Sequence, residues 1–365
     1  SHLVTIDVLG SKKVSLENLQ NEYREGLSAR PEHIRKRLDV IRNKWIEQVE
    51  INFEKSNIVL IRGASGQGKT SLAYRYLLER YAEEQIICIQ KLTNENSIWA
   101  ILNFLKRELE DREYVLYYDV QPGDTFWGII LNAISMHLPD ARLLVTVRED
   151  DYNSSNISRG SVSYEEISLE LYEDEAREIY SQYEQNTFIS FDDLWKTFGN
   201  GGPLLEFIYL INHSMTLEAK INNQITRIDS EIDEREWFNV LAVIAIAGQY
   251  DLSIKLDVLF EKIKLKNASK LLQQFEKEFF VKISDNGERI KCLHSVRAHL
   301  IIKCLEGKFG FNYLQALLLT LSVIDNSTMY LLLEYFSKNK VSEEVVDEFS
   351  NISFEDLSVV EDILR

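Results

Sequence analysis

The sequence is poor in the residues that build flexible linkers. Its 365 residues include only four prolines and fifteen glycines. Long flexible linkers between domains are therefore not expected. Hydrophobic residues make up 45% of the chain and charged residues 27%, which is ordinary for a folded globular protein. A chain of this length suggests two or three domains.

Basic residues are in deficit. The chain has 41 Lys and Arg against 58 Asp and Glu, a formal net charge of −17. A protein that wraps nucleic acid needs Lys and Arg against the phosphates. The charge balance therefore argues against a nucleic-acid partner, although a local basic patch is compatible with it.

Long apolar runs are also missing. The longest, Leu241–Ala247, is far shorter than the ~18 residues of a membrane span, and it reads as a core helix. The N-terminus lacks the basic and then apolar pattern of a signal peptide. Cys88, Cys292 and Cys304 are an odd number without C-x-x-C spacing, each in an apolar stretch. We expect buried free thiols in a reducing compartment, and hence a cytoplasmic protein.

Apolar runs of strand length alternate with helical patterns in the first half of the chain. The strands are apolar on both faces, which is typical of a parallel sheet covered by helices. We therefore expect an α/β domain. The expected strands are 58–61, 86–89, 114–118 and 143–147, and the expected helices are 71–82, 97–110 and 126–138.

The segments on either side of this core are mostly helical in pattern. Residues 1–50 are polar, with helices expected over 17–27 and 31–50. After the core, a shorter strand is expected at 166–169, followed by a helix over 173–183. The remainder of the chain is nearly all helical.

One interruption occurs at 280–294. Two alternating segments there flank Asn286-Gly287, a pair typical of a type I′ hairpin turn. A hairpin between a helix over 266–278 and a helix over 295–305 resembles a winged helix.

Residues 63–70 read GASGQGKT and match G-x-x-x-x-G-K-[ST] in full. The motif lies between an expected strand and an expected helix, as a P-loop requires. Its backbone N–H groups would face the β-phosphate at the positive end of the helix. Lys69 would reach the β- and γ-phosphates and Thr70 would ligate Mg²⁺, which predicts ATP or ADP with Mg²⁺ as the ligand. The expected phosphate-binding residues are Gly63, Ala64, Ser65, Gly66, Gln67, Gly68, Lys69, Thr70 and Ser71.

A second acidic element ends the expected strand EYVLYYD. Asp119 at its end would hold Mg²⁺ through water, as a Walker-B Asp does, although a solvated Asp at a strand end is the alternative. Val120 follows it where many hydrolysing ATPases carry a general-base Glu. Asp124 is the nearest downstream carboxylate that could polarise a water molecule. We expect slow hydrolysis, suited to a switch more than to a motor.

A third element is ARLLVTVRED at 141–150, where another buried strand ends in Thr146, Val147 and Arg148. Arg148 could bind the γ-phosphate and so distinguish triphosphate from diphosphate. The alternative is a surface Arg at a strand end. The candidate catalytic residues are thus Lys69, Asp119, Arg148 and Asp124.

From about residue 30 to about residue 306 the chain resembles the STAND class of P-loop ATPases, which includes the NB-ARC and NACHT modules. The segment LLVTVR is similar to the sensor strand of that class, which ends in Thr-x-Arg. ISLELYEDEAREIY resembles the leucine and acidic-helix segment that follows it. GGPLLEFIYL matches the G-x-P motif, and CLHSVRAHLI resembles the His-Asp motif of the winged helix.

The resemblance implies further roles at matching positions. Pro203 would pack on the nucleotide base, although proline is also simply a favourable residue at the start of a helix. His294 would reach the β-phosphate of ADP from the winged helix and hold a closed form; a core histidine is the alternative. Ser295 stands where the family commonly has Asp, so the strength of that closed state is open.

The resemblance implies an ATP-dependent molecular switch that exchanges ADP for ATP, senses a ligand and forms a homo-oligomer. By the same resemblance, the biological role expected for such a switch is prokaryotic antiviral defence. The alternatives are a DNA-associated AAA+ or STAND transcription regulator and a non-hydrolysing, nucleotide-stabilised scaffold. The expected organisation is a helical linker at 1–50, a P-loop ATPase domain at 51–185, a helical lid at 186–235, a winged helix at 236–307 and a helical tail at 308–365, a possible start of a sensor array.

Overall fold

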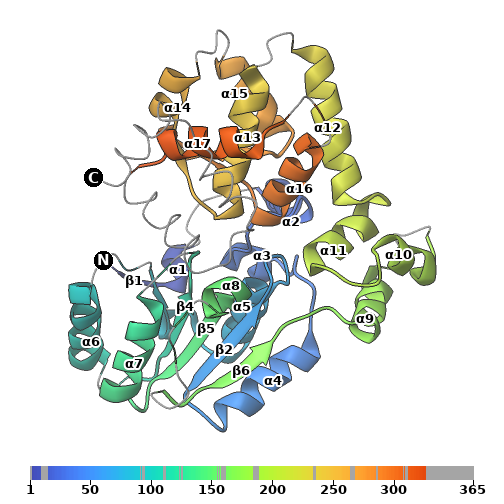
Figure 1. The fold of residues 1–365 in the computed structure, drawn as a ribbon. Coiled ribbons are helices and arrows are strands. Elements are labelled where there is room, and N and C mark those ends of the chain that lie inside the picture. The colour runs from blue at the N-terminus through green and yellow to red at the C-terminus, as the bar shows by residue number, and fades with distance from the viewer. Residues whose placement is uncertain are drawn as a thin grey trace. The chain divides into compact units, whose positions relative to one another are not determined.

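The computed structural model describes residues 2–325 except 10–14, 91, 93–94, 110–111, 123, 125, 154, 156, 158–161, 184–188, 233–235, 264–267, 285–286, 307 and 309–310. The chain divides into two compact units, residues 1–214 and residues 215–365. Figure 1 shows the elements of both units.

The first unit is built on a six-stranded sheet with the order β1-β3-β4-β5-β2-β6. All neighbours pair in parallel except β1, which is antiparallel to β3 at the edge. The predicted parallel sheet is confirmed with this one addition, because a three-residue edge strand is too short to show a period in the sequence. The strands are β1 (Leu3–Thr5), β2 (Ile58–Gly63), β3 (Ile86–Ile89), β4 (Val115–Asp119), β5 (Arg142–Arg148) and β6 (Glu165–Ser168).

Helices cover both faces of this sheet, as Figure 1 shows for α4 on one side and α6 and α7 on the other. Alternate residues of β2 divide between the two layers. Val59 and Ile61 pack with α4 and α5, whereas Ile58 and Leu60 pack with α6 and α7. A strand buried on both faces must be apolar throughout, which is the pattern found in the sequence.

The helices of the first unit, with one 3₁₀ turn (Glu83–Gln85), are α1 (Ile6–Leu9), α2 (Leu16–Arg24), α3 (Pro31–Arg35), α4 (Asn43–Phe53), α5 (Lys69–Arg80), α6 (Glu95–Leu109), α7 (Trp127–His137), α8 (Glu149–Asn153), α9 (Glu173–Tyr183), α10 (Phe191–Thr197) and α11 (Leu204–His213). The last three pack around a second core of aromatic and aliphatic side chains that includes Trp195 and Phe207.

One predicted helix is wrong in extent. The chain forms two helices, α3 and α4, where a single helix over 31–50 was expected. Arg37 between them has a φ of +53°, a left-handed conformation that an α-helix does not contain. The interruption allows Asp39 to accept a hydrogen bond of 2.9 Å from Nε of Arg75 in α5. A buried ion pair with a distant helix thus overrides the local helical pattern.

The second unit combines helices with a small antiparallel sheet of order β7-β9-β8. Helix α13 is its centre, and every residue from Val240 to Gly248 is buried, which confirms the interpretation of Leu241–Ala247 as a core helix. Its elements are α12 (Leu217–Glu231), α13 (Glu236–Gln249), β7 (Ile254–Lys255), α14 (Leu256–Lys262), α15 (Ala268–Lys277), β8 (Val281–Ile283), β9 (Arg289–Cys292), α16 (Ser295–Glu306) and α17 (Tyr313–Val323).

The predicted hairpin is confirmed by the antiparallel pairing of β8 with β9. Val281 pairs with Cys292 and Ile283 with Ile290, so the register is centred between positions 286 and 287. Gly287 has a φ of +72°, which glycine adopts without steric cost. Asn286 itself, Lys266 of the expected preceding helix and the tail beyond 325 lie outside the described residues.

The described residues also bear on membrane spans, metal clusters and cysteines. Across the described segments, no helix is both long enough and apolar enough to cross a membrane. Within those same segments no cluster of His, Cys, Asp and Glu has the make-up of a metal site. Cys88, Cys292 and Cys304 are buried and unpaired, so the prediction of buried free thiols is confirmed.

Candidate nucleotide site

The P-loop connects β2 to α5 at the carboxyl edge of the sheet. Gly63 is the last residue of β2, and Gly68 is the N-cap of α5 with a φ of +80°. Helix α5 begins at Lys69, so the unpaired N–H groups of its first turn lie at the loop. These N–H groups and the helix dipole favour an anion at this position.

The loop glycines are required by space as well as by conformation. A Cβ on Gly63 would lie 2.5 Å from the carbonyl oxygen of Leu169, directly after β6, and the φ of Gly63 is +153°. Gly66 also has a positive φ, of +79°. The Leu169 carbonyl therefore lies against the loop where a side chain at position 63 would otherwise be. Glycine-rich loops of this kind let successive backbone N–H groups face a bound phosphate.

Lys69 lies over the concave side of the loop. Its Nζ donates hydrogen bonds to the carbonyl oxygens of Gly63, at 2.9 Å, and Ala64, at 2.8 Å. Burial and, next, the positive charge of Arg148 together lower the pKa of Lys69 to about 8, against the opposing effect of Asp119. The loop thus holds a cation at the place where phosphate oxygens would gather.

Thr70, in the first turn of α5, lies beside Asp119 at the end of β4. The Thr70 hydroxyl lies 3.4 Å from Oδ2 of Asp119, and the Thr146 hydroxyl donates to Oδ1 at 2.6 Å. A hydroxyl has a single proton, so the Tyr117 hydroxyl, 3.0 Å from Thr146 Oγ1, must be the donor in that contact. Carboxylate and hydroxyl oxygens are the ligands that Mg²⁺ prefers, and the predicted metal residues Thr70 and Asp119 are brought together.

Thr146 is the first residue that the sequence analysis did not assign to the site. It is fully buried in β5, which lies between the P-loop strand β2 and the Asp119 strand β4. A lone threonine within the apolar run LLVTV was the available signal. Only the strand order shows that its hydroxyl faces Asp119 and not the opposite layer.

Arg148 ends β5 and pairs in register with Gly63 of the P-loop. Its charge acts on Lys69, so the structure brings this predicted residue to the loop. Asp151, three residues on, is also buried and raises the pKa of Lys69. No pattern in the sequence singles out that carboxylate.

Asp124 belongs to a different cluster. Its carboxylate accepts a hydrogen bond of 2.6 Å from the Tyr118 hydroxyl and one of 2.9 Å from the Phe126 N–H. Tyr118 faces the α6–α7 layer, whereas Tyr117 faces the α4–α5 layer that carries the P-loop helix. These contacts give Asp124 a role in shaping the loop before α7.

The predicted G-x-P segment touches the P-loop. The Leu205 N–H donates to the Gly66 carbonyl at 3.0 Å, and Nε2 of Gln67 donates to the Gly202 carbonyl at 3.2 Å. Pro203 is the N-cap of α11.

In the second unit, Nδ1 of His294 accepts a hydrogen bond of 3.1 Å from the Val296 N–H at the start of α16.

Arg42 and Glu175 form a buried ion pair behind the P-loop that the sequence analysis missed. Nε and Nη2 of Arg42 donate to the two carboxylate oxygens of Glu175 at 2.6 and 2.8 Å. Nη1 of Arg42 donates to the Gln67 carbonyl at 2.8 Å. Their separation of 133 residues leaves no local signal in a single sequence.

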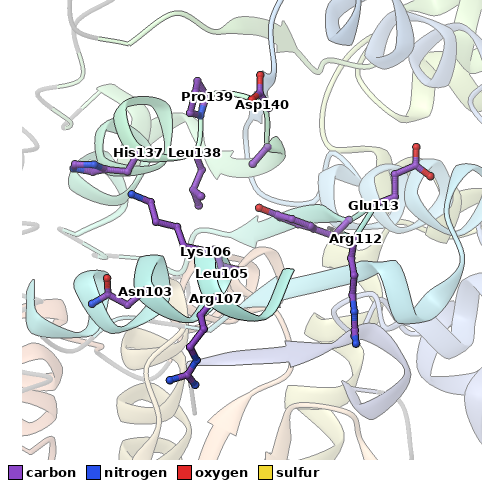
Figure 2. A pocket seen from close by; sticks show the side chains of 12 residues that line it. Asn103, Leu105, Lys106, Arg107, Arg112, Glu113, His137, Leu138, Pro139 and Asp140 are labelled. Atoms are coloured by element: carbon purple, nitrogen blue, oxygen red, sulfur yellow. The ribbon is translucent and has the colours of Figure 1, made fainter. Parts of the chain in front are cut away.

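A pocket of about 650 Å³ lies at the opposite edge of the sheet, where α6 and α7 end and β4 and β5 begin. In Figure 2, Leu138 and Pro139 lie on one side of the pocket. The side chains of Arg107 and Arg112 lie on the other side and extend away from them. The P-loop lies at the carboxyl ends of the parallel strands, so this pocket is separate from the phosphate site. It is lined by Asn103, Leu105, Lys106, Arg107, Arg112, Glu113, Tyr114, His137, Leu138, Pro139, Asp140 and Ala141.

The strand order and the loop between β2 and α5 define an α/β fold of the P-loop NTPase class. No model of a known protein family matches the chain, and no curated protein matches it in sequence. Among solved structures it is similar to a STAND protein with a tetratricopeptide-repeat sensor from Pyrococcus horikoshii, at 18% identity and a TM-score of 0.41, over 89% of this chain and 54% of that one. The chain thus spans about half of that protein's length.

Two further solved structures resemble it. One is Cdc6p from Pyrobaculum aerophilum, at 14% identity and a TM-score of 0.35, over 84% of this chain and 99% of that one. The other is the ORC2 protein of Aeropyrum pernix in its ADPNP and ADP complexes, at 13% identity and a TM-score of 0.33, over 73% and 95%. A STAND protein is thus among the similar structures. The fold assignment itself rests on the strand order and the loop.

Proposed function

We propose that this chain is the nucleotide-binding core of a STAND-type molecular switch, which binds ATP and ADP and hydrolyses ATP slowly. One observation supports it above all others. Lys69, Thr70, Asp119 and Arg148 come from three separate segments and gather at one edge of the sheet, beside a glycine-rich loop with no room for a side chain at Gly63.

In this proposal the residues from Gly63 to Ser71 surround the phosphates, with Lys69 against the β- and γ-phosphates. Thr70 and Asp119 hold Mg²⁺, which supplies positive charge to the phosphate oxygens when bound. Arg148 contacts the γ-phosphate and so responds to the difference between ATP and ADP.

We expect slow turnover because neither of the two positions considered for a general base provides one. Val120 stands beside Asp119, and the carboxylate of Asp124 is engaged by the Tyr118 hydroxyl. Neither position supplies a free carboxylate to a water molecule at the γ-phosphate. A site that binds tightly and hydrolyses slowly suits a held state.

The remaining roles come from the family resemblance. The order from α13 to β9 is a helix, a strand, two helices and two strands. This order matches that of a winged helix and supports assigning one here. We assign it to residues 236–307, with His294 as its contact to the ADP β-phosphate, and we assign Pro203 to the base. Ligand sensing, homo-oligomerisation on ATP binding and a role in antiviral defence belong to the same proposal.

The first experiment identifies the nucleotide carried by the purified protein, by acid extraction and chromatography. We expect close to one ADP per chain in the wild type and none in Lys69→Ala. An empty wild-type protein that also fails to bind added fluorescent mant-ADP would refute the proposal.

Switching is tested separately by the mass of the particle in solution. Light scattering after size-exclusion chromatography should give a monomer with ADP and a larger species with a non-hydrolysable ATP analogue and the activating ligand. A nucleotide that binds without changing particle mass or proteolytic pattern would favour the scaffold alternative.

A further inference from the structure

A buried network fixes the outer side of the P-loop. The side chain of Arg42 is 2% exposed and that of Glu175 is 8% exposed. Arg42 is the N-cap of α4, ahead of the P-loop strand, and Glu175 lies in the first turn of α9, well beyond the sheet. Trp45 Nε1 donates to the same Glu175 oxygen that Arg42 Nε contacts, at 2.9 Å. The ion pair is therefore held from several sides.

The third guanidinium contact reaches the loop itself. Arg42 Nη1 donates to the Gln67 carbonyl at 2.8 Å. A trans peptide is planar, so its N–H points opposite to its C=O. Fixing the Gln67 carbonyl on Arg42 therefore directs the Gly68 N–H to the other side of the loop.

The preceding peptide, between Gly66 and Gln67, is also held through its carbonyl group. The Gly66 carbonyl accepts a hydrogen bond of 3.0 Å from the Leu205 N–H, which directs the Gln67 N–H away from α11. Two successive carbonyls are thus bound on the outer side, and two successive N–H groups point away from that side.

We propose that Arg42, held by Glu175, is a positioning residue of the phosphate site, which keeps the peptide between Gln67 and Gly68 in the orientation that binds phosphate. This inference rests on the proposed nucleotide binding and adds a residue to it. Leu205, which contacts the loop directly, belongs to α11, and Glu175, which holds Arg42, belongs to α9, whereas Arg42 itself lies at the N-cap of α4 ahead of the P-loop strand.

The charges of the pair compensate each other. A test must therefore remove the contact to Gln67 without leaving a buried charge alone, because an unpaired buried charge is itself destabilising. The double variant Arg42→Met/Glu175→Gln meets this condition. It exchanges a net-neutral pair for a neutral pair, and the amide oxygen of the new side chain still serves as an acceptor for Trp45.

The experiment measures the dissociation constant of mant-ADP and the melting temperature for each variant. Arg42→Met/Glu175→Gln should fold, since neutral replacement of a buried ion pair is often tolerated. Its affinity for mant-ADP should fall about 10- to 100-fold, the effect expected for a lost hydrogen bond from a charged donor. Arg42→Lys, which keeps the charge but cannot make the same three contacts, should fall in the same range.

Arg35→Lys is the matched control. Arg35 makes the same fork through Nε and Nη2 to Glu83, at 3.0 and 2.6 Å, on helix α3. It should leave the affinity unchanged. Hydrogen exchange of the peptide that covers residues 63–70 should be faster in the Arg42 variants than in the control.

The outcomes separate cleanly. If the wild type binds mant-ADP, Lys69→Ala does not, and the double variant binds like the wild type while folded, the pair is only structural and this inference is wrong. If the wild type and Lys69→Ala both fail to bind, the proposed function fails first.

Discussion

At the scale of single residues, the site depends on side chains that orient other side chains. Thr146 does not face solvent. Its hydroxyl donates a hydrogen bond of 2.6 Å to Asp119 and accepts one of 3.0 Å from the Tyr117 hydroxyl. The carboxylate that we assign to Mg²⁺ is therefore held from behind by two hydroxyl groups in series. Partners of this kind tune a metal site nearly as strongly as the ligands do.

Thr146→Val removes this hydroxyl and keeps the shape of the side chain. We expect the Mg²⁺ concentration needed for half-maximal ATP binding to rise about tenfold. The free energy of unfolding should fall by about 1–3 kcal/mol, because two buried polar groups lose a partner. Thr320→Val is the control, since Thr320 is equally buried in the second unit and donates to the Ala316 carbonyl. An unchanged Mg²⁺ dependence in Thr146→Val would contradict this account.

Gly63→Ala tests the packing of the loop. The added methyl group would lie 2.5 Å from the Leu169 carbonyl at a φ of +153°. We expect nucleotide binding to be lost and the unfolding free energy to fall by roughly 1–3 kcal/mol. Gly201→Ala should cost little, because nothing lies within 4 Å of the added atom there. Equal melting temperatures for the two variants would show that the loop can shift.

At the scale of elements, the phosphate site is a product of the sheet order. The Asp119 strand and the P-loop strand are not neighbours, because β5 lies between them. The β5 strand therefore contributes both the hydroxyl that holds Asp119 and the arginine beside Gly63. The four inner strands β2, β3, β4 and β5 are buried on both faces between the two layers of helices.

Helix α7 offers a test of how far that layer supports the sheet. Ile134 is fully buried in the α6–α7 layer, whereas Met136 on the same helix is 67% exposed. Ile134→Ala should lower the unfolding free energy by about 2–5 kcal/mol, as for other large-to-small changes in a core. Met136→Ala should change it by about 0.5 kcal/mol or less. Chemical denaturation followed by circular dichroism measures both, and similar midpoints would contradict the packing described.

At the scale of the whole molecule, the three cysteines report on both units. Cys88 lies in the first unit, and Cys292 and Cys304 lie in the second. Burial raises the pKa of the Cys88 thiol to about 12 and that of the Cys292 thiol to about 11. A buried thiol that keeps its proton is a poor nucleophile.

We expect Ellman's reagent at pH 8 to find no reactive thiol in the native protein and three in strong denaturant. Intermediate denaturant should expose either one thiol or two first, which identifies the unit that unfolds first. Rapid reaction of a thiol without denaturant would show that one of the cores is open in solution.

The same thiols make stability depend on pH. The folded pKa of Cys88 lies above the ordinary value of 9.0, so the unfolded state loses this proton first as the pH rises. The unfolding free energy should therefore fall between pH 9 and about 12, by about 1.4 kcal/mol per pH unit for this group. In Cys88→Ala the urea midpoint should fall less between pH 8.5 and pH 10 than it does in the wild type. An equal slope in both proteins would refute the assignment.

The amino-acid sequence alone determined the features that depend on neighbours along the chain. Residues 58–61, 86–89 and 143–147 are strands because continuous apolar runs must be buried on both faces. Gly63–Thr70 form a P-loop because a strand, a glycine-rich turn and a helix follow one another directly. These patterns require no knowledge of the tertiary structure.

Tertiary structure alone decided which distant groups meet. It split the helix expected over 31–50 so that Asp39 reaches Arg75, and it directed Asp124 to Tyr118. It also placed the ion pair of Arg42 and Glu175 behind the P-loop. Asp124 lies six residues from Tyr118, whereas the partners of Asp39 and Arg42 lie 25 to 133 residues away, and a single sequence carries no periodic signal that links any of them. The P-loop is therefore specified by eight consecutive residues, whereas the groups that hold it in shape are supplied by the fold.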